Sequence, residues 1–173
     1  MIYVSEKREK NLIIGLGNSV LTDDAVGLML VSELQKKPEF KNPGNLEFKF
    51  NHSGGLDLLD DITGFSRVLI IDSLEATHLD VGSVHFFELA DLNALKVPRF
   101  ISTHGVSLPT LWELGLTLGY AMPEFCLLAG VVTLDCRSYG EFLSRELQKK
   151  FPAILNEVME SAGMFLSDSV ILN

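Results

Sequence analysis

The sequence has few positive charges and no cluster of them. Its 173 residues include 14 Lys and Arg against 23 Asp and Glu, which gives a formal net charge of -9 at pH 7. Nucleic-acid-binding proteins need a basic footprint for the phosphate backbone, and anionic membrane surfaces attract proteins in the same way. The charge balance therefore argues against nucleic acid and against an anionic membrane surface as partners.

Cysteine is nearly absent as well. Cys126 lies in an apolar run and Cys136 follows it, and neither belongs to a Cys-x-x-Cys pair. Because free cysteine is commonly a small buried hydrophobe, a structural role is favoured over a zinc or redox function.

Export and membrane signals are not visible. The first ten residues carry charges where a signal peptide needs its apolar stretch. Gly115, Gly119, Pro123 and Glu124 divide the low-charge run 114–134 into a helix, a turn and a strand, so it does not predict a membrane span. We therefore expect a cytoplasmic protein with no membrane insertion.

Several hydrolase and nucleotide motifs are missing. The chain contains no G-x-S-x-G, no H-E-x-x-H and no Walker sequence, which disfavours serine hydrolases and zincins. Gly15 and Gly17 begin like a dinucleotide fingerprint, but Val20 replaces its third glycine and the expected acidic residue after the second strand is missing. A doubly wound nucleotide-binding protein thus remains only as an alternative.

Apolar runs alternate with helical periodicity along the whole chain. Strands are predicted at 11–16, 46–50, 68–72, 84–89 and 125–134, and helices at 25–35, 56–62, 107–119 and from Ser138 onward, with an interruption near Pro152. Right-handed crossovers make the first three strands parallel in the order 2-1-3. The fourth strand follows too soon for a crossover helix, so we expect it to be antiparallel.

These elements predict one α/β domain over residues 1–173. The expected architecture is a three-layer α/β/α fold, in which a twisted, five-stranded, mostly parallel sheet with one antiparallel strand carries helices on both faces. Residues 1–10 and 166–173 are expected to fray.

Three potential metal ligands should meet at the carboxyl edge of this sheet, where open α/β sheets bind ligands. Asp24 lies at the start of the first helix, Asp72 at the end of the third predicted strand, and His104 before a later helix. Two carboxylates and one imidazole suit a divalent transition metal such as nickel, zinc or cobalt and leave its shell open. From the residues alone, Asp72 is as compatible with a loop cap as with a ligand.

Other polar residues fall near the same edge. Asn18 and the segment Ser53, Gly54 and Gly55 are expected to contact substrate, since paired glycines let the backbone approach a bound peptide closely. Asp23, with Thr22 as the alternative, is expected to cap the first turn of the first helix.

The order of the motifs resembles the nickel–iron hydrogenase maturation endopeptidases. The resemblance runs from about residue 12 to residue 164 and rests on G-L-G-N-S-V-L-T-D-D-A-V-G (15–27), V-L-I-I-D (68–72), S-T-H-G-V-S-L-P (102–109) and L-L-A-G-V-V-T (127–133), followed by Tyr139-Gly140 and a terminal amphipathic helix. Two segments depart from the usual family pattern. Asp24 stands where many members carry Glu, and Ser53 to Leu56 replace an Asp-Gly-Gly-Thr segment.

The resemblance implies an endopeptidase that removes the C-terminal extension of a nickel-loaded large-subunit precursor. Asp24, Asp72 and His104 would be both the catalytic residues and the ligands of nickel that the substrate carries, and zinc or cadmium could occupy the same ligands. Hydrolysis would use either the metal as a Lewis acid or one of the two aspartates as general base. The precursor would be the partner of an enzyme that is monomeric when free, and a non-catalytic metal-checkpoint chaperone is the alternative.

Overall fold

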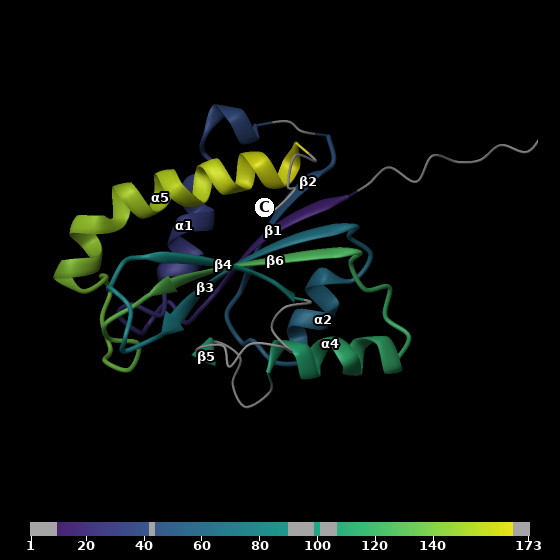
Figure 1. Ribbon diagram of the computed structural model, residues 1–173, viewed down its shortest axis with the longest axis horizontal. Helices are drawn as coiled ribbons and strands as arrows, with labels where there is room; N and C mark the ends of the chain where they lie inside the picture. The colour runs from purple at the N-terminus through teal and green to yellow at the C-terminus, as the bar shows by residue number, and fades with distance from the viewer. Residues whose placement is uncertain (1–9, 42–43, 90–98, 101–106, 168–173) are drawn as a thin grey trace, which may run out of the picture.

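A twisted mixed sheet forms the middle layer of the protein (Figure 1). The computed structural model describes residues 10–41, 44–89, 99–100 and 107–167. The strands are β1 (Asn11–Leu16), β2 (Leu46–Asn51), β3 (Arg67–Glu75), β4 (Val84–Glu88), β5 (Arg99–Phe100) and β6 (Phe125–Val132). They are arranged in the order β2-β1-β3-β6-β4, and the two-residue β5 pairs with β3 outside this path.

The strand pairing confirms the predicted α/β sheet. β1 is parallel to both β2 and β3, β3 is parallel to β6, and β4 is antiparallel to β6. The short antiparallel β5 was not predicted, because two residues carry no readable periodicity.

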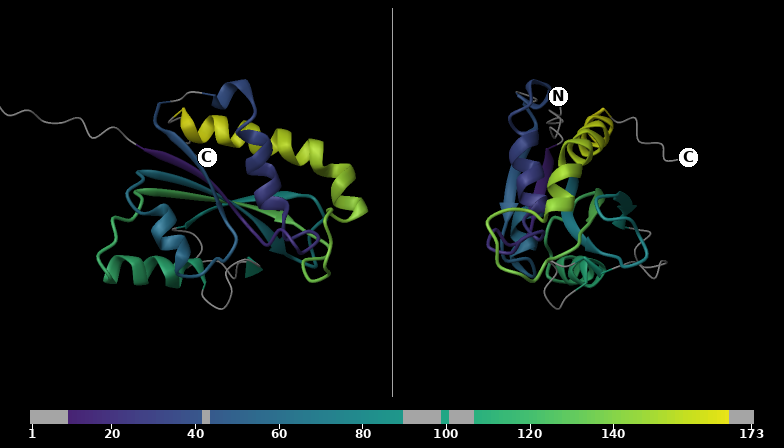
Figure 2. Two further views of the ribbon diagram at one scale, coloured as in Figure 1. Left: turned by 180° about the vertical axis from the view of Figure 1, so that it is seen from behind. Right: turned by 90° about the vertical axis from the view of Figure 1, so that its left-hand side faces the viewer.

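Helices cover both faces of the sheet, as predicted (Figures 1 and 2). The helical segments are α1 (Val26–Leu34), the 3-10 turn η1 (Pro38–Phe40), α2 (Asp57–Ile62), α4 (Leu108–Thr117) and α5 (Arg145–Leu166). Side chains of β3 alternate between two cores, with Leu69 and Ile71 on the face of α1 and α5, and Val68 and Ile70 on the face of α2 and α4. Burial on both faces explains why the middle parts of the central strands are continuous apolar runs. No helix within the described ranges is long and apolar enough to cross a membrane.

The last helix differs from its prediction in two ways. α5 begins at Arg145 instead of Ser138, and it continues through Pro152 without interruption. Pro152 cannot donate to the carbonyl of Gln148, but both residues lie on the exposed side of the helix. Water can therefore satisfy that carbonyl, and the helix tolerates the proline.

Asp72 lies inside its strand, because β3 continues to Glu75. The prediction that Asp72 ends the strand is therefore wrong. Asp72 is paired with Gly130 of β6, whereas the pairing of β3 with β1 stops at Ile71. The chain leaves β1 toward β2 on one side of the sheet, while β3 and β6 lie on the other. Asp72 is thus the first residue of β3 beyond its partnership with β1, at the switch point where doubly wound sheets bind ligands.

The start of α1 lies directly against the sheet because Gly27 has no side chain. A Cβ atom at Gly27 would overlap the carbonyl oxygen of Ile71 and would lie 2.5 Å from that of Leu16. A Cβ atom at Gly15 would in turn lie 2.5 Å from the carbonyl oxygen of Gly27. This close approach holds the residues just before α1 at the carboxyl edge of the sheet.

We predict opposite effects for two glycine-to-alanine substitutions. Gly27→Ala should lower the free energy of unfolding by about 1–3 kcal/mol, because the added methyl group meets backbone atoms that cannot rotate away. Gly163→Ala on α5 is the matched control, since its added Cβ would have no atom within 4 Å. That variant should gain about 0.5–1 kcal/mol from the better helix propensity of alanine. Urea unfolding measures both, and a Gly27→Ala protein as stable as wild type would show that α1 is free to shift.

Candidate functional site

Asp24 and Asp72 meet at the carboxyl edge of the sheet through Ser73. Both carboxylate residues are 1% exposed and Ser73 is fully buried. The Ser73 hydroxyl donates to Oδ1 of Asp24 at 2.9 Å and lies 3.4 Å from Oδ1 of Asp72. The Ser73 N–H donates to the same Asp72 oxygen at 2.7 Å. The structure therefore brings together two of the three predicted ligands, joined by a serine that the sequence analysis had not identified.

Asn18 lies beside this pair and contacts it through its backbone. Its N–H donates to Oδ2 of Asp24 at 2.8 Å, so that both oxygens of the Asp24 carboxylate have a donor. The Asn18 side chain accepts from the N–H of Val20 at 3.1 Å and thereby shapes the loop after β1. A role of Asn18 in substrate binding stays a prediction, and the structure adds that it orients Asp24.

The loop after β2 is built by Asn51, a residue that the sequence analysis overlooked. Its Oδ1 accepts from the N–H groups of Ser53 at 3.2 Å and Gly54 at 2.6 Å, which is the turn geometry that asparagine favours. Gly54 and Gly55 both adopt φ values of 60°. The carbonyl of Asn51 accepts from the N–H of Gly17 at 3.2 Å, so this loop adjoins the loop that carries Asn18.

The third predicted ligand, His104, lies outside the described residues. Within the described ranges, no group of three His, Cys, Asp or Glu side chains is arranged to hold a metal ion. The three-residue ligand set accordingly stays a prediction, of which the structure shows the two carboxylates side by side.

Asp23 holds the loop after β6 instead of capping α1. It is fully buried, and its Oδ2 accepts from the N–H groups of Leu134 at 3.1 Å and Asp135 at 3.0 Å, while its Oδ1 accepts from the N–H of Ser144 at 2.6 Å. The N-cap residue of α1 is Ala25, which makes no side-chain cap. The predicted capping role of Asp23 at α1 is therefore wrong, although Asp23 does bind the N-cap residue of α5.

Thr22, the alternative candidate for the cap of α1, also binds the loop after β6. Its hydroxyl donates to the carbonyl of Ser138 at 2.9 Å, and its N–H donates to the same oxygen at 3.0 Å. Both residues thus tie the loop after β1 to a segment that lies more than a hundred positions away in the sequence. Local spacing does not reveal such partners.

The Cys136 thiol lies near Asp24 and Ser73 but is not activated as a nucleophile. Its Sγ is 3.1 Å from the hydroxyl oxygen of Thr133. Burial raises the pKa of Cys136 to about 12, and the Asp24 carboxylate adds to this shift while hydroxyl contacts oppose it. Burial likewise raises the pKa of Cys126. Both cysteines are neutral thiols at physiological pH, which agrees with the structural role expected for them.

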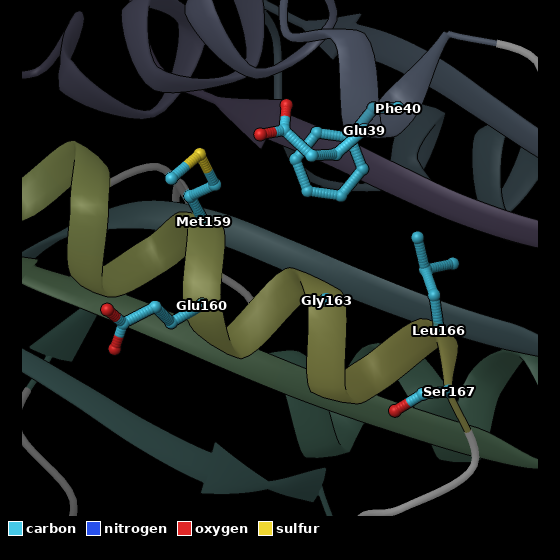
Figure 3. Close-up of a pocket in the computed structure, with 7 residues that line it drawn as sticks. All are labelled: Glu39, Phe40, Met159, Glu160, Gly163, Leu166 and Ser167. Carbon is cyan, nitrogen blue, oxygen red and sulfur yellow. The ribbon is translucent and has the colours of Figure 1, made fainter.

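A separate pocket of about 440 Å³ lies between η1 and the C-terminal end of α5 (Figure 3). It is lined by Glu39, Phe40, Met159, Glu160, Gly163, Leu166 and Ser167. The carboxylates of Glu39 and Glu160 lie well apart (Figure 3), and the lining residues include no imidazole or thiol. Since α1 and α5 both start at the carboxyl edge, their far ends place this pocket at the opposite edge, away from Asp24 and Asp72.

Comparison with known proteins gives both a family and a fold. A family model described as "Hydrogenase maturation protease" matches residues 28–161. The chain is 26% identical over 121 residues to the hydrogenase 2 maturation protease of Escherichia coli K12, covering 70% of this chain and 71% of that protein.

Solved structures show the same fold. The hydrogenase maturating endopeptidase HybD from E. coli superimposes with a TM-score of 0.73 at 23% identity, over 91% of this chain and 93% of that one. The [NiFe] hydrogenase maturation protease HybD from Thermococcus kodakarensis superimposes with a TM-score of 0.61 at 23% identity, over 88% of this chain and 99% of that one.

We predict that Asp23→Asn destabilises the protein by about 1–3 kcal/mol, the usual cost of leaving a buried donor without its acceptor. Either orientation of the new amide turns its nitrogen toward at least one of the backbone N–H groups that the carboxylate now binds. Asp80→Asn is the matched control, because Asp80 is exposed and binds Ser83 through its backbone carbonyl, which the substitution leaves in place. Urea unfolding should show a loss for the first variant and none for the second. Equal stability of the Asp23→Asn protein and wild type would contradict the structural role of Asp23.

Proposed function

Because the chain belongs to the hydrogenase maturation protease family, we propose that it is the endopeptidase that removes the C-terminal extension of a nickel-loaded [NiFe]-hydrogenase large-subunit precursor. The family match confirms the resemblance drawn from the sequence motifs. The observation that carries the proposal is the pair of buried carboxylates, Asp24 and Asp72, joined by Ser73 at the switch point of the sheet.

In this proposal nickel is part of the substrate. Asp24 and Asp72, together with His104, would bind a nickel ion that the cysteines of the precursor already hold, so that a loaded precursor docks productively. The scissile peptide would then lie near two carboxylates and a divalent cation. The cation would polarise the peptide carbonyl as a Lewis acid, or Asp24 or Asp72 would take a proton from the attacking water. In either case the leaving amine must gain a proton.

The donors around Asp24 orient its carboxylate for such a role. The Asn18 N–H binds one oxygen and the Ser73 hydroxyl binds the other, which restricts rotation of the side chain. A ligand or base held in one orientation loses little entropy when the substrate arrives. This preorganisation supports a catalytic site more strongly than a solvent-exposed acidic patch would.

We predict that the protein cuts the nickel-loaded precursor and leaves the metal-free precursor intact. Without the metal, the two carboxylates have no cation through which to engage the substrate. Intact mass measurement of both precursor forms after incubation tests this. Equal cutting of the two forms would contradict nickel recognition but would still show that the protein is a protease. Binding of the loaded form without cutting would indicate the checkpoint chaperone.

We further predict that Asp24→Asn lowers the cleavage rate by about 10²-fold or more without unfolding the protein. The asparagine carbonyl can still accept from the Asn18 N–H, and its amide can donate to the Ser73 hydroxyl, so the variant loses the charge but keeps both hydrogen bonds. Glu113→Gln, which removes an exposed charge from α4, is the control and should cut at the wild-type rate.

His104→Ala should lose cleavage in the same way. Urea unfolding and a timed cleavage assay are run on all three variants. An Asp24→Asn protein that cuts normally would exclude Asp24 from the site.

A further inference from the structure

Two loops at the carboxyl edge expose a group of large apolar side chains. Val20 follows β1, and Leu134, Tyr139 and Phe142 follow β6. They are 55%, 62%, 85% and 72% exposed, and the last three are the most exposed large apolar side chains of the described residues. We refer to these four residues as the apolar rim.

Backbone hydrogen bonds join the two loops that carry the apolar rim. Leu21 and Tyr139 form an antiparallel bridge, and the N–H of Gly140 donates to the carbonyl of Val20 at 3.2 Å. The buried Asp23 carboxylate holds the base of both loops. Figures 1 and 2 show the loops side by side at the carboxyl ends of β1 and β6. Apolar side chains on loops fixed in this way are preorganised for binding, because little backbone entropy is lost on contact.

The apolar rim borders the Asp24–Asp72 pair directly. Asn18 donates its N–H to Asp24 and accepts the N–H of Val20 through its side chain. On the other side, the N–H of Leu134 binds Asp23, the neighbour of Asp24. A macromolecule whose reactive segment reaches the two carboxylates therefore comes close to these loops.

We propose that the apolar rim is the docking surface for the folded body of the large-subunit precursor. This inference rests on the proposed function and names the surface through which the enzyme holds its substrate. The C-terminal extension reaches the carboxyl edge at Asp24 and Asp72, whereas the rim lies beside that pair and contacts a larger apolar surface of the precursor. Exposed aromatic residues of this kind commonly supply most of the energy of a protein interface.

Two other occupants fit the structure less well. A second copy of the chain seated on the rim would cover the carboxyl edge beside Asp24 and exclude substrate. A membrane surface is disfavoured by the net charge of -9, since the anionic lipids of cytoplasmic leaflets attract basic proteins.

The test compares two double variants that remove the same kind of side chain. Tyr139→Ser with Phe142→Ser alters the rim. Leu116→Ser with Leu118→Ser is the matched control, because these leucines are 59% and 60% exposed at the far end of α4. Steady-state cleavage of nickel-loaded precursor is measured for wild type and both variants, with urea unfolding as the check on folding.

We expect the rim variant to raise KM about tenfold or more, with kcat at saturating precursor within about twofold of wild type. The control variant should match wild type in both constants, and both variants should unfold at the wild-type urea concentration because the replaced side chains are exposed. A wild-type enzyme that cuts, together with a rim variant whose KM is unchanged or rises no more than that of the control, overturns the docking surface and leaves the proposed function standing.

Wild-type protein that neither binds nor cuts the precursor overturns both proposals. Sedimentation of the free protein tests for self-association, and flotation with vesicles of anionic or zwitterionic lipid tests for membrane binding. Loss of either behaviour in the rim variant alone, with precursor binding intact, would assign the rim to that other occupant.

Discussion

The close approach of α1 to β1 and β3 determines what can lie at the carboxyl edge of this sheet. Gly15 and Gly27 lack the side chains that would separate helix and strands, and Gly17, at a φ of 142°, leaves room for the carbonyl oxygen of Asp24. These are the glycines that resemble a dinucleotide fingerprint. In a nucleotide-binding loop their missing side chains admit a pyrophosphate. Here the chain itself fills that space with the segment that carries Asp24, whose carboxylate would repel a phosphate, so the glycine pattern gives no support to a nucleotide-binding function.

The same approach gives two adjacent aspartates different tasks. The Asp23 carboxylate accepts hydrogen bonds from three backbone N–H groups and thereby holds together loops that are distant in the sequence. Asp24 is held by one N–H and one hydroxyl, and the same hydroxyl lies beside Asp72. Buried carboxylates are tolerated only when they are hydrogen-bonded, paired or bound to a metal. Asp23 meets that condition through three backbone N–H groups, whereas Asp24 and Asp72 both lie against the hydroxyl group of Ser73.

How far the sequence predicts this protein depends on the range of the interaction concerned. The order of the first three strands followed from apolar runs and crossover rules, because those depend on local periodicity and chain handedness, whereas the places of β4 and β6 in the sheet did not. The edge at which Asp24 and Asp72 meet followed from the same rules. Ser73 was overlooked because it lies inside a buried strand with no local sign of its hydroxyl partner. The role of Asp23 depends on hydrogen-bond donors 111 and 121 positions away. The continuity of α5 at Pro152 depends on which side of the helix faces water. A single sequence shows neither of these.

Under the proposed function, the arrangement of charge and apolar surface explains how a small protease avoids cutting other proteins. Two carboxylates brought together in a buried setting repel each other and gain most from a ligand that brings a cation. A polypeptide without a metal brings none, so the two carboxylates offer it little binding energy. The apolar rim in turn offers nothing to a free metal ion, but it does offer binding energy to a folded partner. Only a substrate that carries both a cation and an apolar surface at the right separation gains from both features at once. Selectivity then arises from the sum of two modest contributions on one rigid edge of the sheet, with no need for a deep specificity pocket beside Asp24.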